Sequence, residues 1–167
     1  MAVTSDPEAS LEPILARPPK ELRDSTTHLL KRVGWVIKER AVGAFEATGL
    51  SPHHYAVLAL LDEQPPETQS MIADALGYDR SHLVGLLDEL EQRGLLARKR
   101  DPSDRRRHLV TLTPEGTRAL NKLRAVVKGV DEELLAPLDK KQRATLHELL
   151  LQLASYHEPR YAAERDS

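Results

Sequence analysis

The apolar residues of this chain recur at three- and four-residue steps over long stretches, which is the spacing of one face of an amphipathic helix. The first such face predicts a long helix that ends at Gly49, and it consists of Leu22, Thr26, Leu29, Leu30, Val33, Ile37, Ala41, Ala44 and Phe45. Two more long helices are predicted toward the C-terminus. Their faces are Leu120, Leu123, Val127, Val130 and Leu134 for one, and Leu146, Leu149, Leu150 and Leu153 for the other.

Shorter helices are predicted in the middle of the chain. Ser51-Pro52 is typical of a helix start, with a capping serine followed by proline in the first turn, and that helix runs until "DEQPPET". The next helix runs from about Thr68 to Gly77, and only "GYD" separates it from "RSHLVGLLDELEQRG", which ends at Gly94. Two short helices joined by a tight turn form a helix-turn-helix, whose second helix is the recognition helix.

A β-hairpin is predicted directly after the recognition helix. The segments "LLARKR" and "RHLVTLT" have the composition of strands, and the "DPSD" between them suits a type I turn. A hairpin at this place is the wing of a winged helix. Thr113-Pro114 then begins the next helix in the same way as Ser51-Pro52. The predicted fold class is therefore mainly α: a winged helix-turn-helix with a short β-hairpin wing and long N- and C-terminal helices.

The long terminal helices have more apolar surface than the small middle domain can cover, which usually indicates a symmetric partner. We therefore predict a helical dimerisation region over residues 21–50 and 114–156, and a winged helix-turn-helix DNA-binding domain over residues 51–113. Residues 1–20 hold four of the eleven prolines and are predicted to be a flexible N-terminal arm. Residues 157–167 are predicted to be a C-terminal tail.

Composition and charge narrow the function classes. The 167-residue chain has no cysteine, which excludes disulfides, thiolate metal sites, cysteine nucleophiles and thiol redox sensing. It has no signal-peptide pattern and no apolar run long enough to span a bilayer, so a cytoplasmic protein is predicted. The net charge is −2, yet six of the 24 lysines and arginines lie between Arg98 and Arg107, on the predicted wing. A charge cluster alone more often marks a solvated loop, but after a helix-turn-helix it indicates contact with DNA.

The segment "RSHLVGLLDELEQRGLLARKRDPSDRRRHLVTLTPEG" resembles the multiple antibiotic resistance regulator (MarR) family of bacterial transcription factors. It carries a Leu-Leu-Asp helix core, a Gly-Leu step into a strand, an Asp-Arg-Arg wing and a Leu-Thr-Pro-Glu-Gly helix start. "GLSPHHYAVLALL" and "MIADALGYDRS" resemble the family's second helix and its helix-turn-helix, so the resemblance covers about residues 22–156. It implies a homodimer that binds a pseudo-palindromic double-stranded DNA operator, most often to repress transcription. It also implies that a small molecule can release the DNA.

The resemblance further implies that Arg106 enters a DNA groove from the wing, with Arg105 beside it. Asp104 would hold an arginine in place by a charge-assisted hydrogen bond. Arginine suits this role because its planar guanidinium holds phosphate oxygens or enters a narrow minor groove. The other arginines of the hairpin are predicted to contact phosphates: Arg107, Arg98 and Arg100.

Base contacts are expected from the first turns of the recognition helix. The outward candidates are Arg80, Ser81, His82 and Gly85, with Leu83 facing the core. His82 is equally well interpreted as an ordinary exposed histidine. Gly85 stands where the family often has a polar or basic residue, which argues against side-chain readout there and for a close approach of the helix. Ser70, near the start of the preceding helix, is predicted to contact a phosphate together with helix N-terminal amides.

A ligand pocket is a second candidate site, because ligands of the family commonly lie between the dimer helices and the winged domain. The candidates for a pocket that takes an aromatic acid are Trp35, His53, His54 and Tyr55. Arg32 or Lys38 is the candidate cationic partner of the acid. The alternative interpretation is core or interface packing, which is the commoner role of such residues.

Other function classes are less well supported. "HELLL" at His147 begins like a zinc-protease motif, but Leu151 stands where the second histidine ligand belongs, so no catalysis is predicted. The seven histidines lack the spacing of known ligand sets, so no metal or cofactor is predicted. A winged-helix adaptor that binds only proteins stays open as an alternative. It would not need three consecutive arginines at the wing tip, and it would lack the salt dependence of DNA binding.

Overall fold

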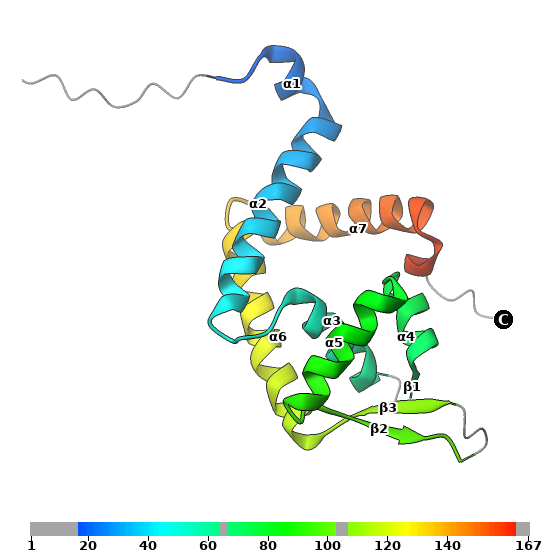
Figure 1. The fold of residues 1–167 in the computed structure, drawn as a ribbon. Coiled ribbons are helices and arrows are strands. Elements are labelled where there is room, and N and C mark those ends of the chain that lie inside the picture. The colour runs from blue at the N-terminus through cyan, green and yellow to red at the C-terminus, as the bar shows by residue number, and fades with distance from the viewer. Residues whose placement is uncertain (1–16, 64–66, 103–106, 163–167) are drawn as a thin grey trace, which may run out of the picture. The chain divides into compact units, whose positions relative to one another are not determined.

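The structure is a computed structural model that describes residues 17–63, 67–102 and 107–162. It is mainly helical (Figure 1). Its elements in chain order are α1 (Lys20–Asp24), α2 (Thr26–Glu46), α3 (Pro52–Glu63), β1 (Glu67–Thr68), α4 (Gln69–Leu76), α5 (Arg80–Gln92), β2 (Leu96–Arg100), β3 (His108–Leu112), α6 (Pro114–Leu134), α7 (Lys140–His157) and the short 3-10 helix η1 (Pro159–Tyr161). The chain forms two compact units, residues 1–36 and 37–167, and α2 belongs partly to each.

In the first unit, α1 and α2 are separate helices, so the prediction of one continuous helix from Leu22 is wrong. Ser25 leaves the helical region, with φ −86° and ψ 109°, and its Oγ accepts a hydrogen bond from the His28 N–H at 3.3 Å. This is the bond of an N-cap, which satisfies one of the free N–H groups at the start of a new helix. The apolar spacing continues across Ser25, so the side-chain pattern gives no sign of the break.

Helix boundaries in the second unit follow the predicted capping residues. Helices α3 and α6 begin at Pro52 and Pro114. Thr68 precedes α4, and its hydroxyl accepts a hydrogen bond from the Met71 N–H at 3.3 Å. Gly49, with φ +66°, follows the last turn of α2. These starts and stops were predictable because cap chemistry depends on only a few neighbouring residues.

The core of the second unit lies where α3, α4, α5, α6 and the sheet meet. Its fully buried members are Val57, Leu58, Leu61, Ile72, Leu83, Leu87, Leu90, Leu96, Val110, Leu120 and Leu123. The predicted inward face of the recognition helix α5 is therefore confirmed. Burying one such side chain stabilises the fold by about 1.5–3 kcal/mol. Four buried leucines of α5 thus fix which side of this helix faces outward.

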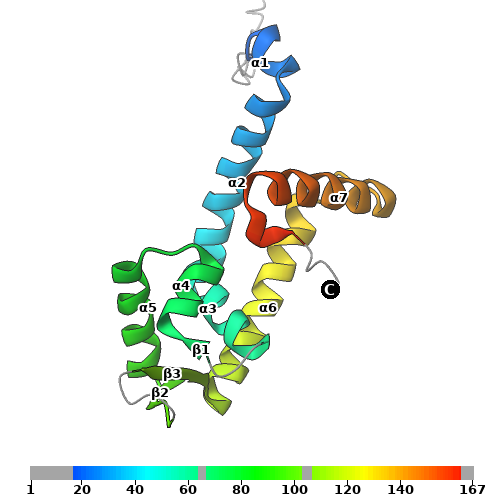
Figure 2. The ribbon, with the colours of Figure 1, turned by 90° about the vertical axis from the view of Figure 1, so that its right-hand side faces the viewer.

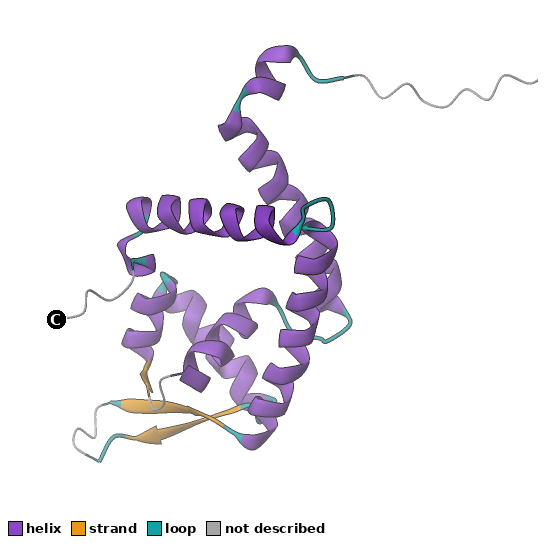
Figure 3. Cartoon of the chain, turned by 180° about the vertical axis from the view of Figure 1, so that it is seen from behind, coloured by secondary structure: helices purple, strands orange, loops and turns teal. Residues whose placement is uncertain are grey.

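The three strands form one antiparallel sheet in the order β1-β3-β2 (Figure 3). Strands β2 and β3 form the predicted hairpin, with Arg98 opposite Val110. Strand β1 is missing from the sequence prediction. It has only two residues and pairs with β3 through Val110 and Leu109. So short a strand shows no alternation of apolar and polar residues, and its partner is distant in the sequence.

The C-terminal part of the second unit contains an element that the sequence did not predict. After α7 the chain folds back into η1 (Figure 2). The Ser155 hydroxyl donates a hydrogen bond to the Tyr161 carbonyl at 2.9 Å, and the Arg160 guanidinium lies against Gly77. Helix η1 therefore contacts the turn between α4 and α5.

Helices α2 and α7 carry large apolar side chains on their surfaces. They are Leu29, Leu30, Val33 and Ile37 on α2, and Leu149, Leu150, Leu151 and Leu153 on α7, each between 41% and 54% exposed. Nothing within the described chain covers these faces fully, as expected for helices that pack against a second subunit. Among the described residues, no helix is long and apolar enough to cross a membrane.

Candidate nucleic-acid interface

The helix-turn-helix consists of α4, a short turn and α5. Gly77 in the turn has φ +65°, and its N–H bonds to the Ala73 carbonyl, so this position favours glycine. Asp79 then caps α5 by accepting hydrogen bonds from the N–H groups of Ser81 at 2.8 Å and His82 at 3.3 Å. The Ser81 hydroxyl also donates to this carboxylate, and this bond, together with the two backbone bonds, lowers the pKa of Asp79. A charged cap therefore fixes the start of the recognition helix.

The structure places the predicted contact residues of the recognition helix on its exposed side. Arg80, Ser81, His82 and Gly85 are exposed, whereas Leu83 is 1% exposed. A Cβ built on Gly85 meets no atom within 4 Å. The glycine thus leaves a smooth stretch of helix, where the backbone can approach another molecule closely. The role of these four residues in reading bases stays a prediction.

His82 belongs to a cluster of three rings. Its ring centroid lies 5.2 Å from that of His53 on α3 and 5.7 Å from that of Tyr78 in the turn, with the rings edge to face. His53 Nδ1 also lies 3.1 Å from the Tyr78 hydroxyl. The cluster restricts the orientation of His82. Tyr78 was not predicted as a site residue, because nothing local links it to a histidine 25 residues earlier. Among the described residues, no three potential metal ligands gather.

Ser70, the predicted phosphate contact, is exposed at the start of α4. It lines one hollow with Arg107 and His108 of the wing, and another with Arg80 and Val84 of α5. The starts of α4 and α5 and the start of β3 therefore share one surface. The N–H groups at helix starts attract anions, and the two guanidinium groups add positive charge. We call Ser70, Arg80 and Arg107 the basic surface.

The wing carries its basic residues at the end away from α6. Strands β2 and β3 pair as far as Arg100 and His108, and the Asp101 N–H extends the ladder by bonding to the Arg107 carbonyl at 3.0 Å. The exposed basic residues at this end are Lys99, Arg100 and Arg107. The predicted tip residues Asp104, Arg105 and Arg106 lie outside the described residues, so their roles stay predictions.

Arg98 differs from the other arginines of the hairpin because its side chain bonds to α5. Its Nε donates to Glu91 Oε2 at 2.9 Å, and its Nη2 pairs with Asp88. The hydrogen bond to Glu91 raises the pKa of Arg98 and lowers that of Glu91. The Arg98 side chain is only 19% exposed. A phosphate contact by Arg98 stays a prediction, but in the structure this residue ties the wing to the recognition helix.

The base of the wing is fastened to α6 by Thr113. Its hydroxyl donates to the Gly94 carbonyl at 2.7 Å and accepts from the Gly116 N–H at 3.0 Å. The Thr113 N–H donates to the Leu95 carbonyl at 3.2 Å. Gly116 lies directly on the same carbonyl, so a Cβ there would overlap it. The Leu-Thr-Pro-Glu-Gly segment thus has a structural explanation, with threonine as the helix cap and glycine as the contact point.

The predicted ligand-pocket residues are spread over both units. In the first unit, Trp35 is 52% exposed, and the Arg32 guanidinium lies 5.0 Å from the centroid of its ring. In the second unit, His53 contacts the helix-turn-helix, and Tyr55 packs edge-on against Phe45 with ring centroids 6.2 Å apart. The contacts of the second unit fit the alternative interpretation of packing. A ligand role for these residues stays a prediction.

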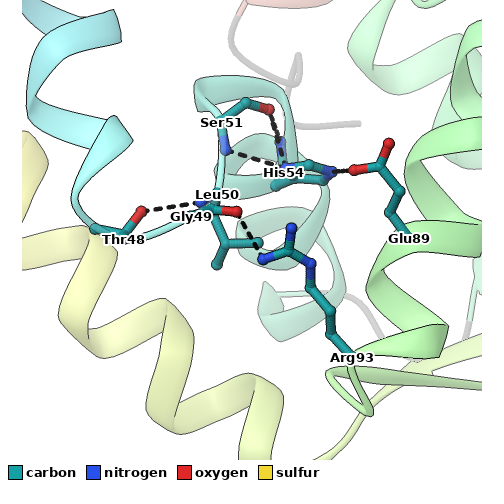
Figure 4. Close-up of polar contacts among 7 residues, drawn as sticks. All are labelled: Thr48, Gly49, Leu50, Ser51, His54, Glu89 and Arg93. Carbon is teal, nitrogen blue, oxygen red and sulfur yellow. Dashed lines mark hydrogen bonds and ion pairs between the residues drawn. The ribbon is translucent and has the colours of Figure 1, made fainter.

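His54 is buried at the start of α3, with 5% of its surface exposed, and connects α3 to the recognition helix (Figure 4). Its Nδ1 accepts a hydrogen bond from the Ser51 N–H at 3.0 Å, which places the ring proton on Nε2. Nε2 lies 3.1 Å from a Glu89 oxygen, close enough for an ion pair but not aligned as a hydrogen bond. Beside it, Arg93 donates to the Gly49 carbonyl at 2.6 Å. Glu89 of α5 and Arg93, the C-cap of that helix, thus contact the junction between α2 and α3.

We expect the protein to lose stability as the pH falls below about 6.5 because of His54. Burial lowers the pKa of His54 below its ordinary value, and Arg93 adds to this effect while Glu89 opposes it. The unfolded chain, in which histidine keeps its ordinary pKa, therefore takes up a proton before the folded protein does. The stabilising contribution is complete above the unfolded pKa and is lost as the pH falls toward the lowered folded value. The slope is at most about 1.4 kcal/mol per pH unit.

Urea unfolding from about pH 7.5 to about pH 5.5, at one protomer concentration, measures this loss. The variant His54→Gln should show a flatter dependence on pH than the unchanged protein. The matched control is His147→Gln, because His147 is exposed on α7, and this variant should keep the original slope. If His54→Gln keeps the original slope, another group causes the loss of stability.

Comparison with known proteins identifies the family. A sequence model of the MarR family matches residues 50–108, from just before α3 to the first residue of β3. The chain is 36% identical over 105 residues to a candidate transcriptional regulatory protein for the hcr operon of Thauera aromatica, and it spans 63% of that relative's length. It is 31% identical to the transcriptional regulator HosA of Escherichia coli O111:H-, over 79% of this chain and 93% of HosA.

Solved structures show the same fold. A structure of CouR bound to a 23-mer DNA duplex has 34% identity and a TM-score of 0.74, over 81% of this chain and 96% of that chain. CouR from Rhodococcus jostii RHA1 bound to p-coumaroyl-CoA has 34% identity and a TM-score of 0.71, over 84% and 97%. The predicted winged helix-turn-helix is thus confirmed. Because the match to HosA covers most of both proteins, this chain belongs to the MarR family of transcriptional regulators.

Proposed function

We propose that this chain binds a pseudo-palindromic double-stranded DNA operator as a homodimer and represses transcription there. The basic surface carries the proposal, because Ser70, Arg80 and Arg107 line adjoining hollows between two helix starts and the wing. Duplex DNA is a dense polyanion, so such a surface gains phosphate contacts and releases counterions. The solved complex of CouR with a DNA duplex supports this role.

The recognition helix supplies the contacts that distinguish one sequence from another. In a winged helix, its N-terminal residues meet base edges in the major groove, and here these residues are Arg80, Ser81 and His82. Arg80 suits a two-bond contact with guanine. His82 presents its ring in the orientation that His53 and Tyr78 hold. At the wing tip, Arg106 enters the neighbouring minor groove.

The exposed leucines of α7 and the exposed apolar side chains of α2 support the proposed homodimer. Packing these faces against a second copy removes them from water. A two-fold dimer sets its two recognition helices about one helical turn of DNA apart, roughly 10 base pairs, which is why the operator repeats in inverted form.

A small organic effector that releases the DNA is part of the same proposal. The solved complex of CouR with p-coumaroyl-CoA, the CoA thioester of an aromatic acid, supports an organic effector that carries an aromatic acyl group. Its candidate contacts are Trp35, His53, His54 and Tyr55. The proposal includes neither a cofactor nor catalysis, and a cytoplasmic location stays a prediction.

Binding of the full-length protein to DNA from the region upstream of its own gene tests the proposal. Salt and random competitor DNA are varied independently. We expect a specific dimer complex whose affinity falls at least about 100-fold between about 50 and 200 mM salt. Nuclease protection should cover two half-sites about 10 base pairs apart.

Two results would contradict the proposal. If neither this DNA nor any fragment from a genome-wide selection survives competitor, the chain does not act on DNA, and the protein-binding adaptor becomes the better interpretation. If a single half-site is protected, the symmetric dimer is wrong.

A further inference from the structure

The recognition helix exposes an apolar side chain on the face that carries the predicted base contacts. Among the described residues of α5, the exposed positions hold polar side chains or glycine, except for Val84, which is 42% exposed. Val84 follows Arg80 by four residues and Ser81 by three, so the three side chains lie on one face of the helix. The apolar side chain is therefore a neighbour of two predicted base contacts.

Packing within the subunit does not explain Val84. Within the described part of the chain, Leu83, Leu86 and Leu87 belong to the core, whereas Val84 neither belongs to it nor packs against it. Valine is β-branched and has a lower helix propensity than alanine, so α5 gains no stability from it. Single exposed apolar residues are common on protein surfaces, so the surroundings of Val84 decide whether it has a role.

Those surroundings are polar and belong to the basic surface. Val84 lines a hollow of about 250 Å³ together with Gln69 and Ser70 of α4 and Arg80 of α5. The next residue is Gly85, where an added Cβ would meet no atom within 4 Å. No side chain at this position holds another molecule away from Val84, so a base edge can approach the valine methyl groups directly.

We propose that Val84 contacts the C5-methyl group of a thymine in the major groove and makes operator recognition depend on that thymine. The inference rests on the proposed function and adds a residue that determines specificity. Every base pair presents hydrogen-bonding groups in the major groove, and thymine adds a methyl group. The valine side chain can neither donate nor accept a hydrogen bond, so this methyl group is the part of a base edge that it can bury.

A second exposed apolar side chain near the basic surface has different surroundings. Met71 is 54% exposed, lies on α4, and lines the other hollow with Arg107 and His108. The first helix of a helix-turn-helix crosses the DNA backbone, whereas the second enters the major groove. Met71 therefore faces sugar and phosphate, and the contact with a base falls to Val84.

The spacing along α5 also places the thymine within the half-site. Four residues of an α-helix rise about 6 Å, and successive bases of one strand are about 3.4 Å apart. For a helix that lies along the groove, the thymine is expected within about two base pairs of the guanine that Arg80 contacts.

The test removes the methyl group and nothing else. The full-length protein first selects duplexes from a randomised pool. Each thymine of the tightest duplex is then replaced by deoxyuridine, at the same position in both half-sites. At the position that Val84 contacts, we expect each half-site to lose about three- to fivefold in affinity, and both together about 10- to 25-fold. Fluorescence anisotropy at constant salt measures the change.

Three variants connect this loss to Val84. Val84→Ala should bind the thymine and deoxyuridine duplexes equally well at that position, whereas Val84→Ile keeps a branched apolar side chain and should keep the preference. The matched control is Gln92→Ala, because Gln92 is exposed at the far end of the same helix. It should keep the full preference. A preference that arises from the shape of the DNA would persist in all three variants.

Two results would overturn the inference and leave the proposed function standing. One is equal affinity for thymine and deoxyuridine at every position of the half-sites. The other is a preference for thymine that Val84→Ala keeps in full. A protein that selects no duplex from the pool would overturn the proposed function, and this inference with it.

Discussion

Replacing Arg106 by alanine is expected to weaken operator binding about 100-fold and to leave the dimer intact. Each subunit of the dimer would lose a groove contact of roughly 1–2 kcal/mol, so the two losses combine. The slope of affinity against salt should also decrease by about 2, one for each lost cation. Fluorescence anisotropy with a labelled operator at several salt concentrations measures both effects.

Two control variants separate the causes of this loss. Arg106→Lys keeps the charge but not the planar guanidinium group. Its operator affinity should therefore lie between that of the unchanged protein and that of Arg106→Ala. Lys140→Ala removes one positive charge from the exposed start of α7 and should stay within about twofold of the original affinity. Unchanged affinity of Arg106→Ala would show that the wing tip does not contact the operator, and the residue roles inferred from the family resemblance would be wrong.

Replacing Gly116 by alanine is expected to destabilise the protein by about 3 kcal/mol or more. The new Cβ would overlap the carbonyl oxygen of Leu95 and lie 2.7 Å from Leu112 Cδ1. The oxygen belongs to the backbone and accepts a hydrogen bond from Thr113, so it cannot move without disturbing the start of α6. Urea unfolding at a fixed protomer concentration measures the change, because the stability of a dimer depends on concentration.

The same helix provides a matched control for this substitution. Gly129 also lies in α6, but a Cβ built there meets no atom within 4 Å. Gly129→Ala should therefore stabilise the helix by up to about 1 kcal/mol, because alanine has the higher helix propensity. If both variants change stability equally, the contact between Gly116 and Leu95 has no special role.

Much of the fold was predictable because its signals are local. Thr68, Asp79 and Thr113 each cap a helix through bonds to residues two or three positions later, and such bonds can be recognised from short segments. The inward leucines of the recognition helix follow from its 3.6-residue period. The order of the helices and of the two wing strands could therefore be predicted before any contact was known.

The elements that escaped prediction depend on distant or weak signals. Strand β1 exists because Glu67 pairs with Val110 across the sheet, and two residues carry no pattern. Ser25 interrupts the first helix through one hydrogen bond to the backbone, while the apolar side-chain period continues. A break of this kind changes the caps but not the periodicity.

The sequence could predict which residues of the candidate site are exposed, but not which side chains bond to one another. Exposure of Arg80, Ser81 and His82 follows from helix geometry alone. The ion pairs of Arg98 with Asp88 and Glu91 depend on how the hairpin packs against α5, which the charge pattern of the wing does not reveal.

The attachment of Arg98 to the recognition helix has a consequence for the operator itself. Charged bonds join Arg98, in the middle of β2, to α5, so we expect the strand and the helix to move together. In the proposed complex with DNA, this would fix the distance between the groove contacts of the recognition helix and those of the wing. Each subunit of the proposed complex would therefore hold its two groove contacts at a fixed separation. One base pair inserted between these two contacts would turn the second groove away by about 35°. The distance between the contacts of one subunit and those of the other is set separately, by the dimer.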